Sequence, residues 1–503
     1  MHPRTAALLS RLLAGVLASV AALGCGCVAS ETGEAPALAQ QKEEIVDIPV
    51  PSVLLLDLLL VIDNSESMRD EQANLGKLLS NVVDALAGRE GGLPDLHIGV
   101  VTSDLGVGPQ AGSVAGCDEE GGDRGAFRAT DANGEWCLSG GEEGLGRYFI
   151  VDETIFDCDY QTNPSCRRKN YSGELKDALA CLANVGTGGC EMEQHLQAMK
   201  QALDNSNPEN IGFLREDALL AVVIVADEDD CSARNRVVFA PQEDSAKSRL
   251  GPLSFRCTEH GVRCDGANLS RAAGKYEDCE PRGDSYLFHP REYLELLKGL
   301  KSNWWQRRIV IAGVTGPAEP FEVRLHDDVP ELAPSCGEAE PVLAYPQPAV
   351  PGVRIRWLVD QFNPPNAPAH NGRNLEICDE NPRVFVSTGW LPHRLANPCI
   401  QGVVENQDID ESRPGLQLEC QVSYHSPWIG DRSIRRCDMD PADPTEPAPG
   451  NVLPCWHAVR DEECCGNYPS RLAIKVRAAA ANTDPGLRII ARCAVGDQAQ
   501  SSQ

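Results

Sequence analysis

Apolar residues recur along the chain with two different periods, which predict alternating strands and helices. The run from Asp57 to Ile62 is apolar after its first residue and too short to span a membrane, so it predicts a buried parallel strand. Further on, apolar residues return at helical spacing until Gly88, which is typical of a helix end. These positions are Leu75, Leu78, Leu79, Val82, Val83 and Leu86. A strand followed at once by an amphipathic helix is therefore expected.

The same alternation continues further along the chain. Apolar strands are predicted at Leu96–Thr102, Tyr148–Val151, Ala218–Ala226 and Arg308–Val314, with a short one before Cys378. Helical spacing marks Leu175–Leu182, Met192–Leu203, Glu292–Leu300 and Arg354–Phe362, while Arg383–Trp390 fits either a strand or a helix. Because strands alternate with helices, the predicted class is α/β, with a doubly wound, mostly parallel sheet flanked by helices and interrupted by cysteine-rich insertions.

The pattern changes near Cys399. From there Pro, Asp and Cys become more frequent, and helical periodicity disappears. Short alternating runs at Leu416–Tyr424, Leu472–Val476 and Leu487–Cys493 indicate strands. Residues 399–497 are therefore expected to form a small β-rich module held by disulfides, and residues 498–503 a disordered tail.

The N-terminal residues have the pattern of an export signal. Arg4 and Arg11 flank an apolar stretch rich in Ala and Leu, which is typical of a cleaved signal peptide over residues 1–24. Small residues before Cys25 are similar to a bacterial lipobox, so we expect Cys25 to carry lipid and anchor the chain to a membrane. Cys27 is the alternative lipidation site. Residues 25–50 lack a hydrophobic period and predict a flexible tether.

The 21 cysteines indicate an oxidising compartment, because thiols scattered through an exported chain generally pair as disulfides. Cys181 and Cys190 flank a glycine-rich loop, and we expect them to pair across it. Zinc is disfavoured, since the chain has no pair of C-x-x-C knuckles. The formal net charge of −29 argues against a nucleic-acid partner, which requires clustered Lys and Arg.

The sequence after the first predicted strand contains the pattern D-x-S-x-S, made by Asp63, Ser65 and Ser67. Spacing by two allows a turning backbone to aim all three oxygens at one point, as a hard cation requires. The free N–H groups of the following helix would favour an anionic ligand beside that cation. Taken alone, the pattern also fits a serine-rich turn in which Ser65 or Ser67 caps the helix.

Strand, D-x-S-x-S turn and helix together resemble the metal-ion-dependent adhesion site of the von Willebrand factor type A domain. The resemblance implies a Rossmann-like domain over residues 51–398, with insertions at 105–171 and 228–290. The chain is also similar to exported lipoproteins of myxobacterium-like bacteria, in which such a turn and a cysteine-rich tail occur together.

The resemblance further implies a threonine ligand from a second loop and an aspartate from a third. Asp227 directly follows the strand at 218–226 and matches the third position. At the second position the chain departs from the family, because Cys190 follows the glycine pair. Thr187 is the candidate replacement, with Glu191 or a water as alternatives.

The function implied by this resemblance is cation-dependent binding of a protein. A divalent cation, Mg²⁺ in the first place and Ca²⁺ or Mn²⁺ as alternatives, would keep a coordination position open for an acidic side chain of a protein partner. The chain lacks the patterns G-x-S-x-G and H-E-x-x-H, so an enzyme is not expected. The alternatives are a structural envelope protein stiffened by its cation and, less favoured, a hydrolase. Gly26 follows Cys25 in place of the aspartate that signals inner-membrane retention in enteric bacteria, which favours the outer membrane or cell surface.

Overall fold

The fold comes from a computed structural model of the chain. It describes residues 42–48, 55–88, 92–139, 148–154, 167–216, 218–241, 244–301, 308–337, 348–363, 371–379, 399–400, 402–404, 406–410, 412–425, 432–465, 468–477 and 488–496. The expected signal peptide, Cys25, the segment Arg383–Trp390 and the C-terminal tail lie outside these residues. Among the described helices, none combines the length and the apolar character needed to cross a bilayer.

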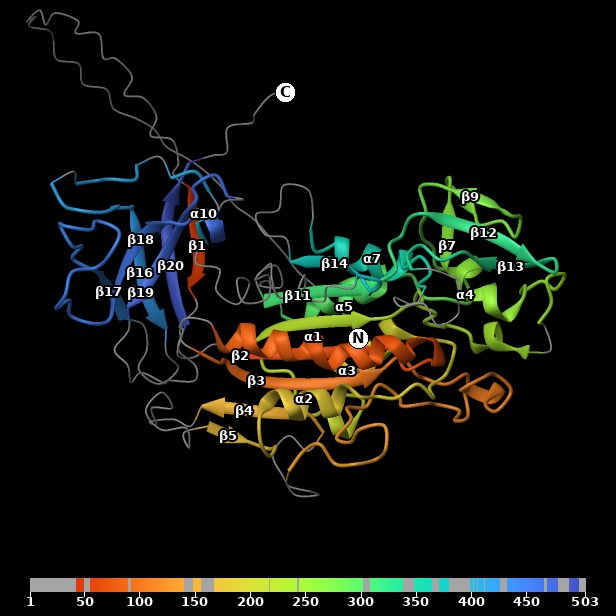
Figure 1. Cartoon of the computed structure of the whole chain (residues 1–503). Helices are drawn as coiled ribbons and strands as arrows, with labels where there is room; N and C mark the ends of the chain where they lie inside the picture. Colours follow the sequence, from red (N-terminus) through yellow and green to blue (C-terminus); the bar gives the residue numbers. More distant parts are fainter. Residues whose placement is uncertain are drawn as a thin grey trace, which may run out of the picture. The chain divides into compact units, whose positions relative to one another are not determined.

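The first of two seven-stranded sheets contains the strands predicted from residues 57 to 376. Its order is β14 (Gly372–Glu376), β11 (Ile309–Thr315), β6 (Leu219–Val225), β2 (Leu55–Ile62), β3 (Asp95–Thr102), β4 (Ile150–Thr154) and β5 (Arg167–Lys169). The five strands from β14 to β3 pair in parallel, whereas β4 and β5 are antiparallel. The segment 105–171, expected as an insertion, thus adds two strands to the sheet edge (Figure 1).

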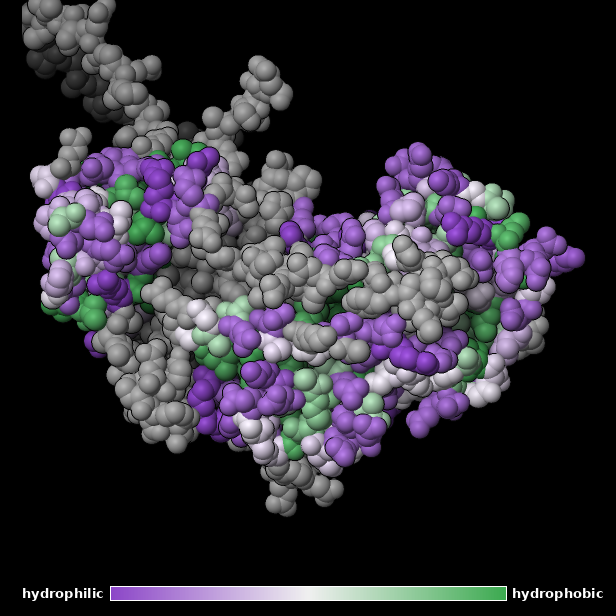
Figure 2. Space-filling model, in the orientation of Figure 1, coloured by the Kyte–Doolittle hydropathy of each residue, from purple (hydrophilic) through white to green (hydrophobic). Residues whose placement is uncertain are grey.

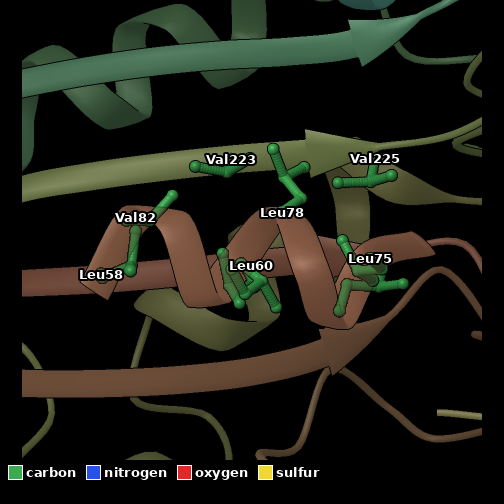
Figure 3. Close-up of a pocket in the computed structure, with 9 residues that line it drawn as sticks. Leu58, Leu60, Leu75, Leu78, Val82, Val223 and Val225 are labelled. Carbon is green, nitrogen blue, oxygen red and sulfur yellow. The ribbon is translucent and has the colours of Figure 1, made fainter. Parts of the chain in front are cut away.

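Helices bury the apolar side chains on both faces of this sheet. Leu58 and Leu60 of β2 pack in one core with α1 (Arg69–Ala87) and α2 (Leu175–Ala183). Leu59 and Val61 point the other way, into a core with α3 (His195–Leu203), α5 (Arg291–Leu300) and α7 (Val353–Asp360). Because successive side chains of a strand point to opposite faces, an entirely apolar strand is buried on both sides. In Figure 3 the apolar face of α1 lies against β2 and β6.

Two three-stranded sheets lie outside this arrangement. One contains β10 (Glu280–Pro281), β7 (Val262–Cys264) and β8 (Ala267–Asn268), next in the chain to α4 (Leu253–Gly261). The other contains β13 (Val329–Leu332), β12 (Phe321–His326) and β9 (Gly274–Tyr276). Short 3₁₀ turns, η1 (Glu66–Met68), η2 (Gly108–Gln110), η5 (Pro208–Asn210) and η6 (Arg236–Phe239), complete the described elements up to residue 379.

The second seven-stranded sheet joins the C-terminal region to an N-terminal strand. Its order is β1 (Lys42–Ile48), β20 (Arg488–Val495), β16 (Cys420–His425), β17 (Arg432–Arg436), β18 (Cys455–Arg460), β19 (Leu472–Arg477) and β15 (Cys399–Ile400). The short helix α10 (Glu462–Cys465) lies between β18 and β19 in the chain. Because β1 also lies against β15 and β19, the sheet is nearly closed. Residues 42–48, expected within the tether, therefore form a strand instead.

The predicted fold class is wrong for the chain. The described residues form four sheets, and eleven of the sixteen strand pairings are antiparallel, which is a mixed architecture rather than a helix-flanked, doubly wound α/β fold. Strands joined by short connections pair antiparallel, since a parallel pair needs a long crossover. The cysteine-rich segments contain many such short connections. Antiparallel pairs therefore outnumber the parallel pairs on which the prediction was based.

Eight disulfides join cysteines of the described residues: Cys117–Cys190, Cys137–Cys181, Cys231–Cys257, Cys264–Cys279, Cys336–Cys378, Cys399–Cys465, Cys420–Cys493 and Cys437–Cys455. The expected Cys181–Cys190 bridge is wrong. Cys181 lies on α2 and Cys190 in the loop before α3, and each pairs with a cysteine of the segment 105–139. So many disulfides are the pattern of a protein exported to an oxidising compartment. On the face in view in Figure 2, hydrophilic residues cover most of the described surface, consistent with the large negative charge.

Candidate cation site

The D-x-S-x-S turn, residues Asp63–Ser67, lies at the carboxyl end of β2 and is called the ligand turn below. The Asp63 N–H donates to the Val225 carbonyl at 2.9 Å, which extends the pairing of β2 with β6 by one residue. The Asp63 carboxylate then accepts a hydrogen bond from the Ser65 N–H at 2.9 Å. This local bond turns the chain out of the strand, as Asp side chains commonly do. The turn leads through η1 directly into α1.

Asp227 lies beside the ligand turn, although 160 positions separate it from Ser67. The Ser67 hydroxyl donates to Oδ1 of Asp227 at 3.2 Å, and the Ser65 and Ser67 hydroxyls lie 2.8 Å apart. The reason is topological, because β2 and β6 are adjacent parallel strands whose carboxyl ends meet at one edge of the sheet. Four of the predicted ligands, Asp63, Ser65, Ser67 and Asp227, are therefore neighbours.

Thr187 is not joined to these residues. In the described part of the chain, no hydrogen bond links its hydroxyl to Asp63 or Asp227. Its loop touches the ligand turn through another residue, since the Gly189 N–H donates to the Asn64 carbonyl at 2.7 Å. A Cβ at position 189 would lie 2.3 Å from the Asn64 side chain, so a larger residue there requires the Asn64 side chain to shift. The alternative ligand Glu191 is exposed to solvent.

Two residues that the sequence reasoning missed, Glu193 and His195, lie beside the site. Glu193 is only 3% exposed, and its Oε1 has no hydrogen-bond partner among the described residues. His195 begins α3, is completely buried, and places Nε2 3.3 Å from Oδ2 of Asp63. That distance suits an ion pair, but neither ring nitrogen makes a well-oriented hydrogen bond within the described residues. The sequence feature that could have pointed to these two residues is an acid and a histidine at the start of the helical spacing of apolar residues in α3.

Buried negative charge dominates the electrostatics of the site. Burial raises the pKa of Asp227 well above its ordinary value, and the charges of Asp63 and Glu228 raise it further. The pKa of Glu193 rises for the same reasons, with burial first and then the charges of Glu228 and Asp63. For His195, burial lowers the pKa, but the nearby Asp63 and the charge of Asp230 outweigh this effect and raise it. In each of the three cases the negative charge of Asp63 contributes to the rise of the pKa.

These residues fit a cation. Several buried oxygens in and around the ligand turn lack a hydrogen-bond partner within the described residues, and a buried oxygen without a partner is costly. They are Asp63 Oδ2, Asn64 Oδ1, Glu71 Oε2, Gln72 Oε1 and Glu193 Oε1. A divalent ion with carboxylate and hydroxyl ligands would satisfy such oxygens and offset the repulsion. As they stand, no three His, Cys, Asp or Glu side chains of the described residues form a ready-made metal site, so hydroxyls and water would complete the coordination.

Two further acids after β6, Asp229 and Asp230, have structural partners. Asp229 accepts hydrogen bonds from the N–H groups of Arg354 and Ile355 and so caps α7. Asp230 accepts from the Leu196 N–H of α3 and pairs with the buried guanidinium of Arg354 at 3.1 Å. Helix N-termini favour such carboxylates. The structure therefore uses both residues to hold helices.

The comparisons with known proteins assign no family. No family model matches the sequence, and no curated protein does. Two pilus adhesins of known structure, RrgA from Streptococcus pneumoniae and SpaC from Lactobacillus rhamnosus GG in its open conformation, align with 90% of the chain at 9% identity and a TM-score of 0.25. The alignments span only 57% of RrgA and 40% of SpaC. Similarity this low carries no argument about fold or function.

Proposed function

We propose that the protein is an exported binding protein of the von Willebrand factor type A kind. In this proposal Asp63, Ser65, Ser67 and Asp227 hold a divalent cation, and the cation binds an acidic side chain of a protein partner. The observation that carries the proposal is the junction of the two strand ends, where Ser67 bonds to Asp227 while Oδ2 of the buried Asp63 has no hydrogen-bond partner within the described residues. His195 Nε2 lies 3.3 Å from this oxygen, and a bound cation would add a second positive charge among the carboxylates.

The exposure of the site residues supports a role in recognition. Asp63 is completely buried and Asp227 is 3% exposed, so these carboxylates would hold an ion from beneath. Ser67 is partly exposed, and its neighbours Glu66 and Glu228 are exposed. The outer side of the site therefore reaches solvent, where a carboxylate from a partner could take a remaining coordination position.

Export and anchoring form a second part of the proposal. The disulfides support export, and lipidation of Cys25 would attach the chain to the outer membrane or cell surface. Mass spectrometry of the mature N-terminus tests this step. A diacylated Cys25 supports the anchor, whereas an unmodified N-terminus or lipid on Cys27 contradicts the assignment to Cys25.

The cation site is tested by isothermal titration calorimetry of the full chain with Mg²⁺, Mn²⁺ and Ca²⁺. Asp63→Asn and Asp227→Asn should abolish binding, because each removes a charged ligand but retains the shape of the side chain. Glu292→Gln, which removes an exposed acid on α5, should bind like the wild type. Equal binding by all four proteins would contradict the site.

Partner binding is tested by capture from cell-envelope extracts with and without EDTA. A partner that is released by EDTA and absent from the Asp63→Asn capture supports recognition through the cation. A partner retained equally in both conditions contradicts it. If the cation only stabilises the fold, EDTA will lower the melting temperature without releasing a partner from the folded protein.

A further inference from the structure

The chain contains two Asn-Gly pairs, Asn133-Gly134 and Asn371-Gly372, and the structure places them in opposite surroundings. Asn133 lies exposed in a turn of the segment 105–139, whereas Asn371 is only 4% exposed and directly precedes β14. Asn is a chemically labile residue, and a following glycine leaves the next backbone nitrogen unhindered because it has no side chain. The two pairs therefore share one chemistry but differ in access and in freedom to move.

The turn around Asn133 is short and open. The Asp131 N–H donates to the Glu135 carbonyl at 3.0 Å and closes the base of the turn. Gly134 has a φ of +79°, and a Cβ at this position would meet no atom within 4 Å. The Asn133 side chain donates from Nδ2 to Oδ2 of Asp131 at 3.1 Å. At the surface such a bond contributes little against competition from water, so the Asn133 side chain can turn towards the Gly134 nitrogen.

The pair Asn371-Gly372 is held in place on both sides. The Asn371 carbonyl accepts the Ile311 N–H of β11 at 2.9 Å. The Gly372 N–H, which belongs to the nitrogen that would have to react, donates to Oδ1 of Asn363 at 2.8 Å. A Cβ at position 372 would lie 2.1 Å from the Val359 carbonyl oxygen, so the backbone is closely packed here. Reaction at this pair requires β14 to open from the sheet, and such local opening is rare in a packed element.

We propose that Asn133 is a site of spontaneous deamidation, which converts it to a mixture of aspartate and isoaspartate. The backbone nitrogen of Gly134 gives its proton to a base in the solvent and attacks Cγ of Asn133. The new N–Cγ bond closes a cyclic imide, while the Cγ–Nδ2 bond breaks and Nδ2 takes a proton from the solvent and leaves as ammonia. Water then adds to either carbonyl of the imide, and the opened ring is aspartate or isoaspartate. This inference is independent of the proposed function.

Deamidation at this position changes both the charge and the backbone of the turn. The product carboxylate adds a negative charge between Asp131 and Glu135, where like charges repel, and isoaspartate inserts a methylene group into the main chain. The neighbouring Ala132 ties the turn to the end of α2, since its N–H donates to the Asn184 carbonyl at 2.8 Å. A Cβ at Gly186 would lie 2.9 Å from the Ala132 Cβ, so the turn also touches the loop after α2. The reaction should loosen both contacts.

Peptide mapping by mass spectrometry tests the inference on the folded full chain, kept for several weeks in mildly alkaline buffer. Asn133 should react at least about 10-fold faster than Asn371, because the buried pair reacts only after local opening. The same chain in concentrated urea is the matched control, and there the two pairs should react at similar rates. Gly134→Ala places a Cβ beside the attacking nitrogen and should slow the reaction at Asn133 by about 10-fold or more.

Three outcomes overturn the inference. The first is an Asn133 that stays intact in the folded chain over the time in which both pairs react in urea. The second is equal reaction of Asn133 and Asn371 in the folded chain, because the structure then selects neither. The third is a Gly134→Ala variant that reacts as fast as the wild type, since attack by the Gly134 nitrogen is the proposed step. The first two comparisons use only the wild type, so they hold even if Gly134→Ala does not fold.

Discussion

The hydroxyl of Ser67 donates a hydrogen bond of 3.2 Å to the carboxylate of Asp227, across 160 positions of sequence. This bond joins the ends of β2 and β6, and it combines two sequence patterns into one site.

Asp227→Asn should have different effects on the stability of the cation-free protein and on the stability gained by cation binding. Without a cation, the variant should melt at or above the wild-type temperature, because it removes one of several buried negative charges that repel one another. With added Ca²⁺ or Mg²⁺ the wild type should gain stability, about 2.7 kcal/mol when the ion is at 100 times its Kd, and the variant should gain little. Differential scanning calorimetry in EDTA and in excess ion measures both effects. A variant that gains as much as the wild type would contradict a role for Asp227 in binding.

Gly189→Ala should disturb the ligand turn. The new Cβ would lie 2.3 Å from the Asn64 side chain, so this side chain or the loop of Gly189 must shift, and cation affinity should fall. Gly188→Ala is the matched control, since a Cβ at position 188 meets no atom within 4 Å and its backbone does not require glycine. Titration calorimetry compares the two variants. Equal affinities would show that the contact between Gly189 and Asn64 does not position the ligands.

Arg354→Met should destabilise the fold strongly. The guanidinium is 1% exposed and pairs with Asp230, which also caps α3, so removing it leaves an uncompensated buried carboxylate. Breaking such a pair costs about 3–5 kcal/mol. The exposed pair of Arg413 and Asp410 provides the control, and Arg413→Met should change stability by less than about 1 kcal/mol. Guanidinium denaturation measures both. A similar small loss in both variants would contradict the structural role of the Arg354–Asp230 pair.

Glu153 should contribute stability that depends on pH. The hydrogen bond from His97 at 3.0 Å, aided by Arg168 and Arg215, lowers the pKa of Glu153 to about 2 despite the opposing effect of burial. The unfolded chain titrates near pH 4.3, so this contribution is complete above that pH and is lost as the pH falls towards 2.

The corresponding variant is Glu153→Gln, studied by urea denaturation from pH 2 to pH 7. It should be less stable than the wild type at pH 6, and the difference should shrink on acidification. A difference that stays constant over this range would show that folding does not lower the pKa of Glu153.

Val82→Ile should stabilise the core beneath α1. A small apolar cavity lies between α1 and strands β2 and β6, and Val82 lines it together with Leu58, Leu60 and Val223 (Figure 3). An added methyl group that fills such a space typically contributes about 0.5–1.5 kcal/mol. Val237→Ile, at a 49% exposed valine, should leave stability nearly unchanged. The free energy of unfolding from urea titrations tests this, and a less stable Val82→Ile variant would show that the core is already fully packed.

The sequence by itself determined the local elements and part of the site. A short, entirely apolar run rich in Val and Ile, such as Leu219–Val225, predicts a strand buried on both faces, and the helical spacing of Leu75 to Leu86 predicts a helix with one buried face. Both elements form where they were expected. The D-x-S-x-S spacing also determined that Asp63, Ser65 and Ser67 lie together, because they are neighbours in the chain. Asp227 was predictable because it directly follows a buried parallel strand, and such strand ends share one edge of the sheet.

Only the tertiary structure decided what depends on distant contacts. Pairing of cysteines follows proximity in space, which is why Cys190 joins Cys117 rather than Cys181. Strand β1 forms only because β20, more than four hundred residues later, offers an edge to pair with. Glu193 carries no motif, and its place beside Asp63 results from backbone bonds to the loops after β3 and β6. Local periodicity predicts which residues are buried, whereas long-range packing decides which buried charges face one another.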